Sequence, residues 1–285
     1  MRPGEDAPRT RLRGHELSAR EVTVAYDGVD VVHAADITLR PGEVTALVGP
    51  NGSGKSTLLR TIARLQRARD ASLTIDGDTD GLAMTARQFS LHVALLTQAR
   101  PTPGGLTVRD LVEFGRYPHR GRWGRSDPDG PAAVGRALRL TGVEELAGRG
   151  AEQLSGGQLQ RVWLASCLAQ ETGVLLLDEP TTYLDLRYQV ELLDLVRDLA
   201  DDHGIAVGVV LHDLDQAAAV ADRIALLEAG RVVADGPPED VLTPERLTAV
   251  YGIRIDVGTD PLTGRLRTRA IGRHHTRTER LGTTS

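Results

Sequence analysis

The stretch GPNGSGKST (residues 49–57) restricts what this chain can fold into more than any other part of its sequence. An apolar run precedes it at 44–49, and apolar residues with helical spacing follow it at 57–65. A loop of this kind between a strand and a helix turns its backbone amides inward around phosphate oxygens. The residues that match the pattern G-x-x-x-x-G-K-[ST] are Gly49, Gly54, Lys55 and Ser56. The motif therefore predicts a strand–loop–helix unit that binds the phosphates of a nucleotide.

The lysine of this loop, Lys55, is the only lysine among 34 basic residues. An ammonium group is a compact point charge that fits between phosphate oxygens, whereas a planar guanidinium does not. We therefore expect Lys55 to neutralise the β- and γ-phosphates and the Ser56 hydroxyl to bind Mg²⁺. The alternative is a glycine-rich turn with an incidental lysine, and the flanking strand and helix patterns argue against it.

Composition excludes several other functions. The net charge is −5 and aromatic residues make up 3%, so we do not expect a nucleic-acid partner. The sequence shows no secretory signal and no apolar run of about 20 residues that could span a bilayer. The lone cysteine, Cys167, lies on an apolar helical stretch, which favours a packing role. We expect a cytoplasmic protein that reaches a membrane only by binding another chain.

Strand-like and helix-like segments alternate along the chain. The expected strands lie at 17–26, 30–40, 44–49, 72–77, 92–98, 173–180, 205–213 and 223–236. Their apolar runs suit a sheet covered on both faces, and the alternation with helices implies right-handed crossovers and parallel strands.

Between about 99 and 160 the pattern changes to helices, which predicts a helical subdomain inserted in the core. Helices are expected at 106–117, with Thr107 and Asp110 as a capping pair, and at 132–143. The polar N-terminal segment 1–16 and the Arg-rich C-terminal tail 265–285 are predicted to be flexible.

A second anion-binding loop follows about 100 residues later, in the stretch LSGGQLQRVWLA (154–165). Ser155, Gly156 and Gly157 precede a helical pattern, so bare amides and the positive helix end face the same point. This loop has no lysine and is incomplete by itself. The stretch VLLLDEP places Asp178 and Glu179 just past a buried strand, although such a strand end is often merely solvated.

These segments, in this order, resemble the ATPase subunit of ATP-binding-cassette (ABC) transporters. The resemblance rests on GPNGSGKST, Gln98, LSGGQ, LLLDEP, the LD pair at 184–185 and His212, and it covers 17–264. It implies an α/β fold of the P-loop NTPase class (RecA-like, mainly parallel sheet) with an N-terminal antiparallel β-subdomain and an inserted helical subdomain. It also implies a phosphate loop that binds ATP through Gly49, Pro50, Asn51, Gly52, Ser53, Gly54, Lys55, Ser56 and Thr57.

In that family the loop that corresponds to LSGGQ (154–158), called the signature loop, binds the ATP held by another subunit. The resemblance thus implies a head-to-tail dimer of two copies, which forms two equal composite sites from two incomplete ones. Asp185 resembles the aspartate that crosses to the partner chain. The signature residues implied to contact the partner's ATP are Ser155, Gly156, Gly157 and Gln158.

The resemblance also implies the chemical roles. Asp178 would hold Mg²⁺, and Glu179 would polarise the attacking water. Gln98 would reach both Mg²⁺ and this water, and His212 would contact the γ-phosphate. Tyr26 resembles the aromatic residue that stacks on adenine, although a packed or surface tyrosine is the simpler alternative. The remaining histidines are read as structural or solvated: His15, His33, His92, His119, His203 and the pair His274–His275.

Two segments narrow the resemblance further. LTVRDLVEFGRYPHRGRWG (106–124) and TTYLDLRYQVELLDLVRDLA (181–200) are similar to the ATPases of iron(III)–siderophore importers. This implies two membrane permease subunits as partners, an extracytoplasmic substrate-binding protein, and a peripheral location on the cytoplasmic face of the membrane. The alternatives are the ATPase of a cobalamin, haem or metal importer, or an ABC ATPase without a transport function.

Overall fold

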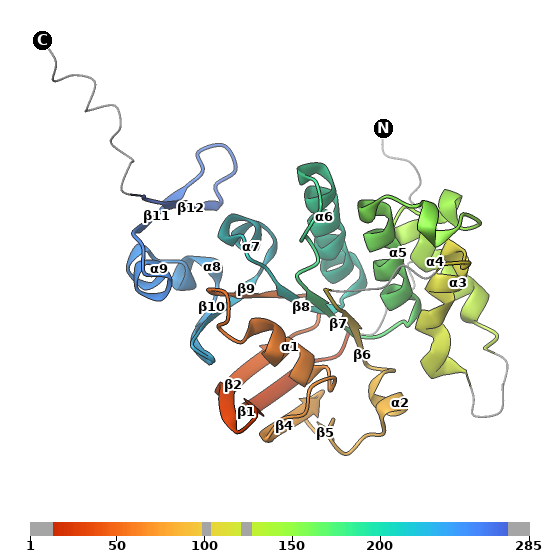
Figure 1. Cartoon of the computed structure of the whole chain (residues 1–285), viewed down its shortest axis with the longest axis horizontal. Helices are drawn as coiled ribbons and strands as arrows, with labels where there is room; N and C mark the ends of the chain where they lie inside the picture. Colours follow the sequence, from red (N-terminus) through yellow and green to blue (C-terminus); the bar gives the residue numbers. More distant parts are fainter. Residues whose placement is uncertain (1–13, 99–103, 121–126, 273–285) are drawn as a thin grey trace, which may run out of the picture.

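The centre of the fold is a six-stranded sheet with the strand order β10-β9-β3-β8-β7-β6 (Figure 1). The structure is a computed structural model, and it describes residues 14–98, 104–120 and 127–272. Strands β9, β3, β8, β7 and β6 are parallel, and β10 pairs antiparallel with β9 at one edge. The strands are β3 (Val44–Val48), β6 (Val93–Leu96), β7 (Val174–Asp178), β8 (Ala206–Val210), β9 (Arg223–Glu228) and β10 (Arg231–Gly236). The predicted mainly parallel sheet is confirmed.

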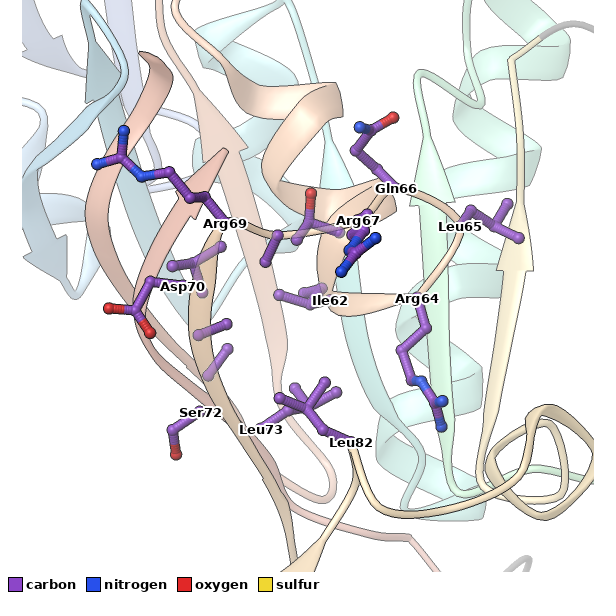
Figure 2. A pocket seen from close by; sticks show the side chains of 15 residues that line it. Ile62, Arg64, Leu65, Gln66, Arg67, Arg69, Asp70, Ser72, Leu73 and Leu82 are labelled. Carbon is purple, nitrogen blue, oxygen red and sulfur yellow. The ribbon is translucent and has the colours of Figure 1, made fainter. Parts of the chain in front are cut away.

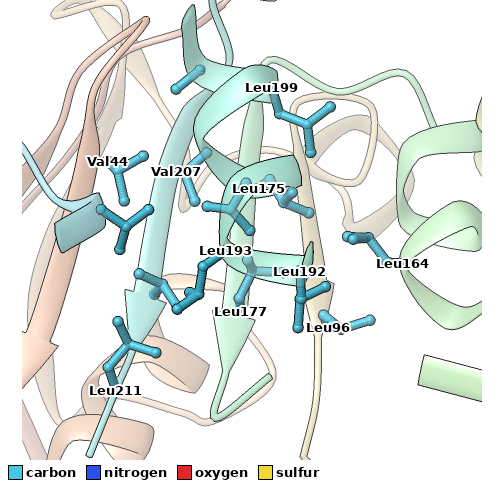
Figure 3. Packing of buried hydrophobic residues seen from close by; sticks show 14 of the residues in the cluster. Val44, Leu96, Leu164, Leu175, Leu177, Leu192, Leu193, Leu199, Val207 and Leu211 are labelled. Carbon is cyan, nitrogen blue, oxygen red and sulfur yellow. The ribbon is translucent and has the colours of Figure 1, made fainter. Parts of the chain in front are cut away.

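Both faces of this sheet are covered, because every residue of β3, β7 and β8 is buried. Successive side chains of a strand point to opposite faces. Leu175 and Leu177 accordingly belong to one hydrophobic cluster, and Leu176 belongs to the other. Figure 3 shows the first cluster, where Leu192 and Leu199 of a long helix face the strands.

Helices cover one face of the six-stranded sheet, and a helix with a second sheet covers the other. The first face packs against α5 (Gly156–Ala169), α6 (Leu186–His203) and α7 (Leu214–Val220). The second face packs against α1 (Lys55–Ile62) and an antiparallel sheet of order β2-β1-β4-β5. That sheet consists of β1 (Leu17–Tyr26), β2 (Val29–Leu39), β4 (Asp70–Ile75) and β5 (Thr79–Asp80), and it is followed by α2 (Ala86–Phe89). The predicted antiparallel β-subdomain is confirmed.

The segment between β6 and β7 is helical where the structure describes it (Figure 1). Thr107 and Asp110 form the expected capping box at the start of α3. The predicted helix 106–117 becomes a 3-10 helix after Glu113, and Pro118, which has no backbone N–H, lies inside that 3-10 helix. The elements are α3 (Val108–Glu113), η1 (Phe114–His119), α4 (Gly130–Leu140), η2 (Glu144–Leu146) and η3 (Ala151–Gln153).

The C-terminal part corrects one prediction. Leu266–Ala270 was expected to be part of a flexible tail, but it forms strand β12 and pairs with β11 (Ile255–Thr259). Thr268 of β12 is also anchored to the core, because Asp215 of α7 accepts hydrogen bonds from its backbone N and its Oγ1 at 2.7 and 2.8 Å. The alternating arginines of this strand conceal it in the sequence. Before it come α8 (Pro238–Val241) and α9 (Pro244–Tyr251).

Some predictions fall outside the described residues, namely the segment 1–13, the first residues of the helical insertion at 99–103, and the tail from 273 with His274 and His275. Within the described ranges, no helix combines the length and the apolar character needed to cross a membrane. Cys167 is partly buried and packs against the first cluster, as its apolar surroundings suggest.

Candidate nucleotide-binding site

The phosphate loop connects β3 to α1, as its flanking sequence predicts. Only glycine fits at position 49, because φ is +145° and an added Cβ would lie 2.1 Å from the carbonyl oxygen of Leu227. Strand β9 thereby presses against the base of the loop. The close backbone approach fixes where the loop amides lie relative to the sheet edge.

Lys55 is 4% exposed and points back into its own loop. Its Nζ donates hydrogen bonds to the carbonyl oxygens of Gly49 and Pro50, each at 2.9 Å. Burial lowers the pKa of Lys55, and the nearby carboxylates of Glu179 and Asp178 act in the opposite direction. The loop thus directs the Lys55 amine to two of its own carbonyl oxygens, with two carboxylates close enough to affect its pKa.

Three of the predicted site residues meet at one carboxylate. Gln98 Nε2 donates to Oε2 of Glu179 at 2.5 Å, and His212 Nε2 lies 2.7 Å from its Oε1. Thr182 Oγ1 also donates to Oε2, at 3.3 Å. These residues follow the carboxyl ends of β6, β7 and β8, which are neighbours in the sheet and therefore converge at one edge.

The backbone of Glu179 helps to direct its side chain. Its φ is +50°, in the left-handed region that non-glycine residues seldom adopt. The chain turns sharply at the end of β7, so Asp178 stays buried in the sheet while Glu179 reaches the site edge. Strained backbone of this kind is concentrated at functional sites.

Asp178 has a partner that the sequence reasoning missed. Nε and Nη2 of Arg60 donate to Oδ2 of Asp178 at 2.9 and 2.7 Å. The other oxygen, Oδ1, is buried and has no hydrogen-bond partner. Arg60 follows Ser56 by four residues in α1, and this helical spacing is the signal in the sequence that places both on one face.

Tyr251, at the end of α9, is a second residue that sequence reasoning missed. Together with Gly49, Glu179, His212 and the tip of the phosphate loop, it lines an open depression of about 750 Å³. Burial raises the pKa of Tyr251 to about 12, and a hydrogen bond with the Gly49 backbone acts in the opposite direction. Tyr251 follows Gly49 by about 200 residues, so no local pattern indicates their contact.

The signature loop is pre-formed but lies elsewhere. Ser155 Oγ accepts a hydrogen bond from the N of Gln158 at 3.3 Å, and Gln158 Oε1 accepts one from the N of Ser155 at 3.0 Å. This capping box leaves the amides of Gly156 and Gly157, the first two residues of α5, without a helical acceptor. No signature residue is among those that line the depression at the phosphate loop.

The remaining predicted residues are also separate from that depression. Asp185 is the exposed N-cap of α6, and Tyr26 ends β1 with 46% of its surface exposed. A different cavity, of about 490 Å³, lies beside the C-terminal end of α1 and contains none of the predicted site residues (Figure 2). Arg64, Arg67 and Arg69 are among its lining residues.

Comparisons with known proteins agree with this geometry. Residues 32–182 match the family described as ABC transporter. The ferric enterobactin transport ATP-binding protein FepC of Escherichia coli (strain K12) is 40% identical over 89% of this chain and 92% of its own length. The iron(3+)-hydroxamate import ATP-binding protein FhuC of Bacillus subtilis (strain 168) is 39% identical over 88% of this chain and 93% of its own.

Two solved structures are similar as well. An inward-facing metal-chelate type ABC transporter has a TM-score of 0.78 and 26% identity, covering 92% of this chain and 99% of its own. The dimeric structure of a bacterial ABC transporter cassette has a TM-score of 0.69 and 26% identity, covering 78% and 98%. A P-loop ATPase core with a complete phosphate loop and a separate signature loop defines the class of this protein. The chain belongs to the ABC transporter family, and it is an ATP-binding ATPase.

Proposed function

We propose that this protein is the ATP-hydrolysing subunit of an importer that takes up iron(III)–siderophore complexes. The observation that carries the hydrolytic part is the junction of Gln98, Glu179 and His212 beside the phosphate loop. The siderophore part is supported by the similarity to transport ATPases for ferric enterobactin and iron-hydroxamates over most of the chain.

Hydrolysis follows from the contacts at this junction. Phosphate oxygens replace the Gly49 and Pro50 carbonyls as partners of Lys55, which brings the only lysine onto the β- and γ-phosphates. Glu179 accepts the proton of the attacking water as general base. Gln98 orients this water, and His212 contacts the γ-phosphate, since both already lie within hydrogen-bond distance of the Glu179 carboxylate. The adenine stacks on Tyr26.

The residues present fit Mg²⁺. Oδ1 of Asp178 is buried and lacks a hydrogen-bond partner, so it can accept from a metal-bound water or bind the ion. The described residues contain no group of three His, Cys, Asp or Glu side chains that could hold a metal unaided. This agrees with an ion held by few protein groups and by the nucleotide phosphates, here through Ser56, Gln98 and Asp178. When bound, Mg²⁺ would neutralise charge that develops on the phosphates.

A second copy of the chain completes each site. The amides of Gly156 and Gly157, in the first turn of α5, have no intrahelical acceptor, and neither glycine lines the depression at the phosphate loop. A head-to-tail dimer would bring these amides, together with Ser155 and Gln158, onto the partner's ATP. The neighbouring surface is apolar and exposed: Tyr183 is 97% exposed beside Asp185, which would cross to the partner.

A groove between the core and the helical segment supports binding to a membrane permease. It encloses about 800 Å³ and runs from the end of α1 to η1. Leu65 and Tyr117, two of its lining residues, are 67% and 70% exposed and so offer apolar surface to a partner. Arg64, Arg87 and Arg120 also line the groove, so the segment that fits it is amphipathic and acidic. Two permeases would thus bind the two copies, and they would receive cargo from an extracytoplasmic substrate-binding protein.

Cobalamin import is the second candidate. A cobalamin import ATP-binding protein BtuD of Halobacterium salinarum (strain ATCC 700922 / JCM 11081 / NRC-1) is 44% identical over 83% of this chain. The match covers only 58% of that relative, whereas the siderophore relatives match over nearly their whole length. We therefore favour siderophore import.

Uptake of labelled cargo separates the two candidates. In cells of the source organism that lack the gene, transport of a radiolabelled iron(III)–siderophore should be lost, and uptake of labelled cobalamin should be unchanged. The wild-type gene should restore iron uptake, and a gene carrying Glu179→Gln should not. Normal iron uptake with lost cobalamin uptake would favour the second candidate, and loss of neither would contradict a role in importing both kinds of cargo.

A further inference from the structure

Arg60 and Asp178 form an ion pair at the base of the nucleotide site. Asp178 is 1% exposed, and both hydrogen bonds from Arg60 end on its Oδ2, at 2.9 and 2.7 Å. The Arg60 side chain is 42% exposed, and its guanidinium reaches this buried carboxylate. Two donors on one oxygen restrict rotation of that carboxylate.

The ion pair with Arg60 uses only one of the two carboxylate oxygens of Asp178. Oδ1 of Asp178 remains without a partner although it is buried, and Asp178 lies close enough to Lys55 to affect its pKa. Ser56 precedes Arg60 by four residues on the same face of α1. One helix face thus carries both the hydroxyl expected to bind Mg²⁺ and the guanidinium that holds the Asp178 carboxylate.

We propose that Arg60 is a positioning residue for magnesium binding: it holds Oδ2 of Asp178 and leaves Oδ1 available to an ion that Asp178 and Ser56 would bind. This inference rests on the proposed function of the site. Arg60 does not need to leave when the ion arrives, because it occupies only the oxygen that the ion does not use. It also compensates a carboxylate charge that would otherwise be buried without a strong partner.

Two other roles for Arg60 make different predictions. As a competitor for the carboxylate, Arg60 would weaken metal binding, and its removal would tighten it. If Arg60 were a surface residue without influence on the metal, its removal would leave metal affinity unchanged. The positioning role predicts weaker metal binding after removal, because groups that orient metal ligands typically contribute about 10- to 100-fold to affinity.

Mn²⁺ is a suitable probe, since free Mn²⁺ is measured directly by electron paramagnetic resonance. The full-length chain, in excess over a non-hydrolysable ATP analogue so that the nucleotide is protein-bound, is titrated with Mn²⁺ against a blank of the analogue alone; nucleotide affinity is measured separately in EDTA. Arg60→Met should weaken Mn²⁺ binding by about tenfold or more, with little change in nucleotide affinity in EDTA. Arg60→Lys, which keeps the charge but loses the two-donor geometry, should fall in between. Unchanged or tighter Mn²⁺ binding by Arg60→Met would overturn the proposal.

Two controls make the result specific. Arg69→Met removes an exposed ion pair with Asp30 and should bind Mn²⁺ like the wild type. In a chain with Asp178→Asn, adding Arg60→Met should have little further effect, because Arg60 acts through Asp178. If Arg60→Met does not fold, Arg60→Lys decides: wild-type affinity for Mn²⁺ would overturn the proposal. A wild-type chain that binds no Mn²⁺ with the analogue would instead contradict the proposed function itself, and the inference with it.

Discussion

Nε2 of His212 lies 2.7 Å from Oε1 of Glu179, and Gln98 occupies the other oxygen of the same carboxylate. The carboxylate proposed as the general base is therefore held by the two side chains proposed to act on the γ-phosphate and the water. In the proposed mechanism, binding of ATP gives His212 and Gln98 new partners and so frees the carboxylate to accept a proton. This arrangement would link nucleotide binding to activation of the proposed base.

Glu179→Gln should abolish turnover while preserving ATP binding, because the amide keeps the shape of the side chain but accepts no proton. ATP hydrolysis should fall by about a hundredfold or more, in line with the contribution of general bases. An ATP-bound dimer should accumulate and elute earlier from a sizing column. Glu245→Gln, at an exposed position of α9, is the matched control and should hydrolyse ATP normally. Near-normal hydrolysis by Glu179→Gln would contradict the assignment of the base.

Lys55→Met should stabilise the nucleotide-free protein and abolish the further stabilisation by ATP. The pKa of Lys55 is lowered by burial from its ordinary 10.5, so the folded state disfavours the ammonium relative to the unfolded chain. Removing this buried charge relieves that cost, and the same change removes the partner of the phosphates. Thermal unfolding with and without ATP measures both effects.

The sign of the pH dependence follows from the same shift. Between the lowered pKa of Lys55 and 10.5, the unfolded chain binds more protons than the folded protein, so wild-type stability rises with pH. The advantage of Lys55→Met should be largest at neutral pH and should shrink as the pH approaches 10.5. A difference that is independent of pH, or a variant less stable at neutral pH, would contradict this account.

Gly157→Ala should disturb the signature loop through a contact within the chain. An added Cβ would lie 3.0 Å from Cγ of Tyr188, and the guanidinium carbon of Arg161 lies 5.8 Å from the centre of that ring. ATPase activity should drop several-fold, whereas ATP binding by the single chain should not change. Tyr188→Ala in the same chain should restore part of the activity, because it removes the clash. If the double variant is as inactive as Gly157→Ala, the steric explanation is wrong.

Part of the site can be predicted from short patterns in the sequence, and part only from the family resemblance. The phosphate loop, Asp178 and Glu179 follow apolar strand patterns directly, and parallel strands bring their carboxyl ends together. Gln98 and His212 were assigned by resemblance, and the contacts of Glu179 could not be derived from spacing alone.

The parts that were missed depend on contacts between distant segments. Tyr251 approaches Gly49 only after the C-terminal helices fold back onto the core. Arg60 is visible as a helical neighbour of Ser56, but its partner is a strand residue more than 100 positions away. Strand β12 was mistaken for a tail because alternating arginines conceal a pairing that β11 and Asp215 provide.

Mixed dimers test the central claim, that each ATP is held by Lys55 of one chain and the signature loop of the other. A chain with Ser155→Arg damages the signature loop but keeps its own phosphate loop, and a chain with Lys55→Ala has the reverse defect. In the mixed dimer, one composite site collects both lesions and the other has none, whereas each pure variant dimer has one lesion in both sites. A dimer of one wild-type and one Lys55→Ala chain first establishes that a single intact site turns over.

The decisive measurement is the ATPase rate of the purified mixed dimer of Ser155→Arg and Lys55→Ala chains, relative to the two pure variant dimers. Sites shared between the chains predict that mixing restores activity to the level of the dimer with one wild-type chain. If the mixed dimer stays as inactive as the pure variants while that control is active, each chain completes its own site, and the shared-site account is wrong.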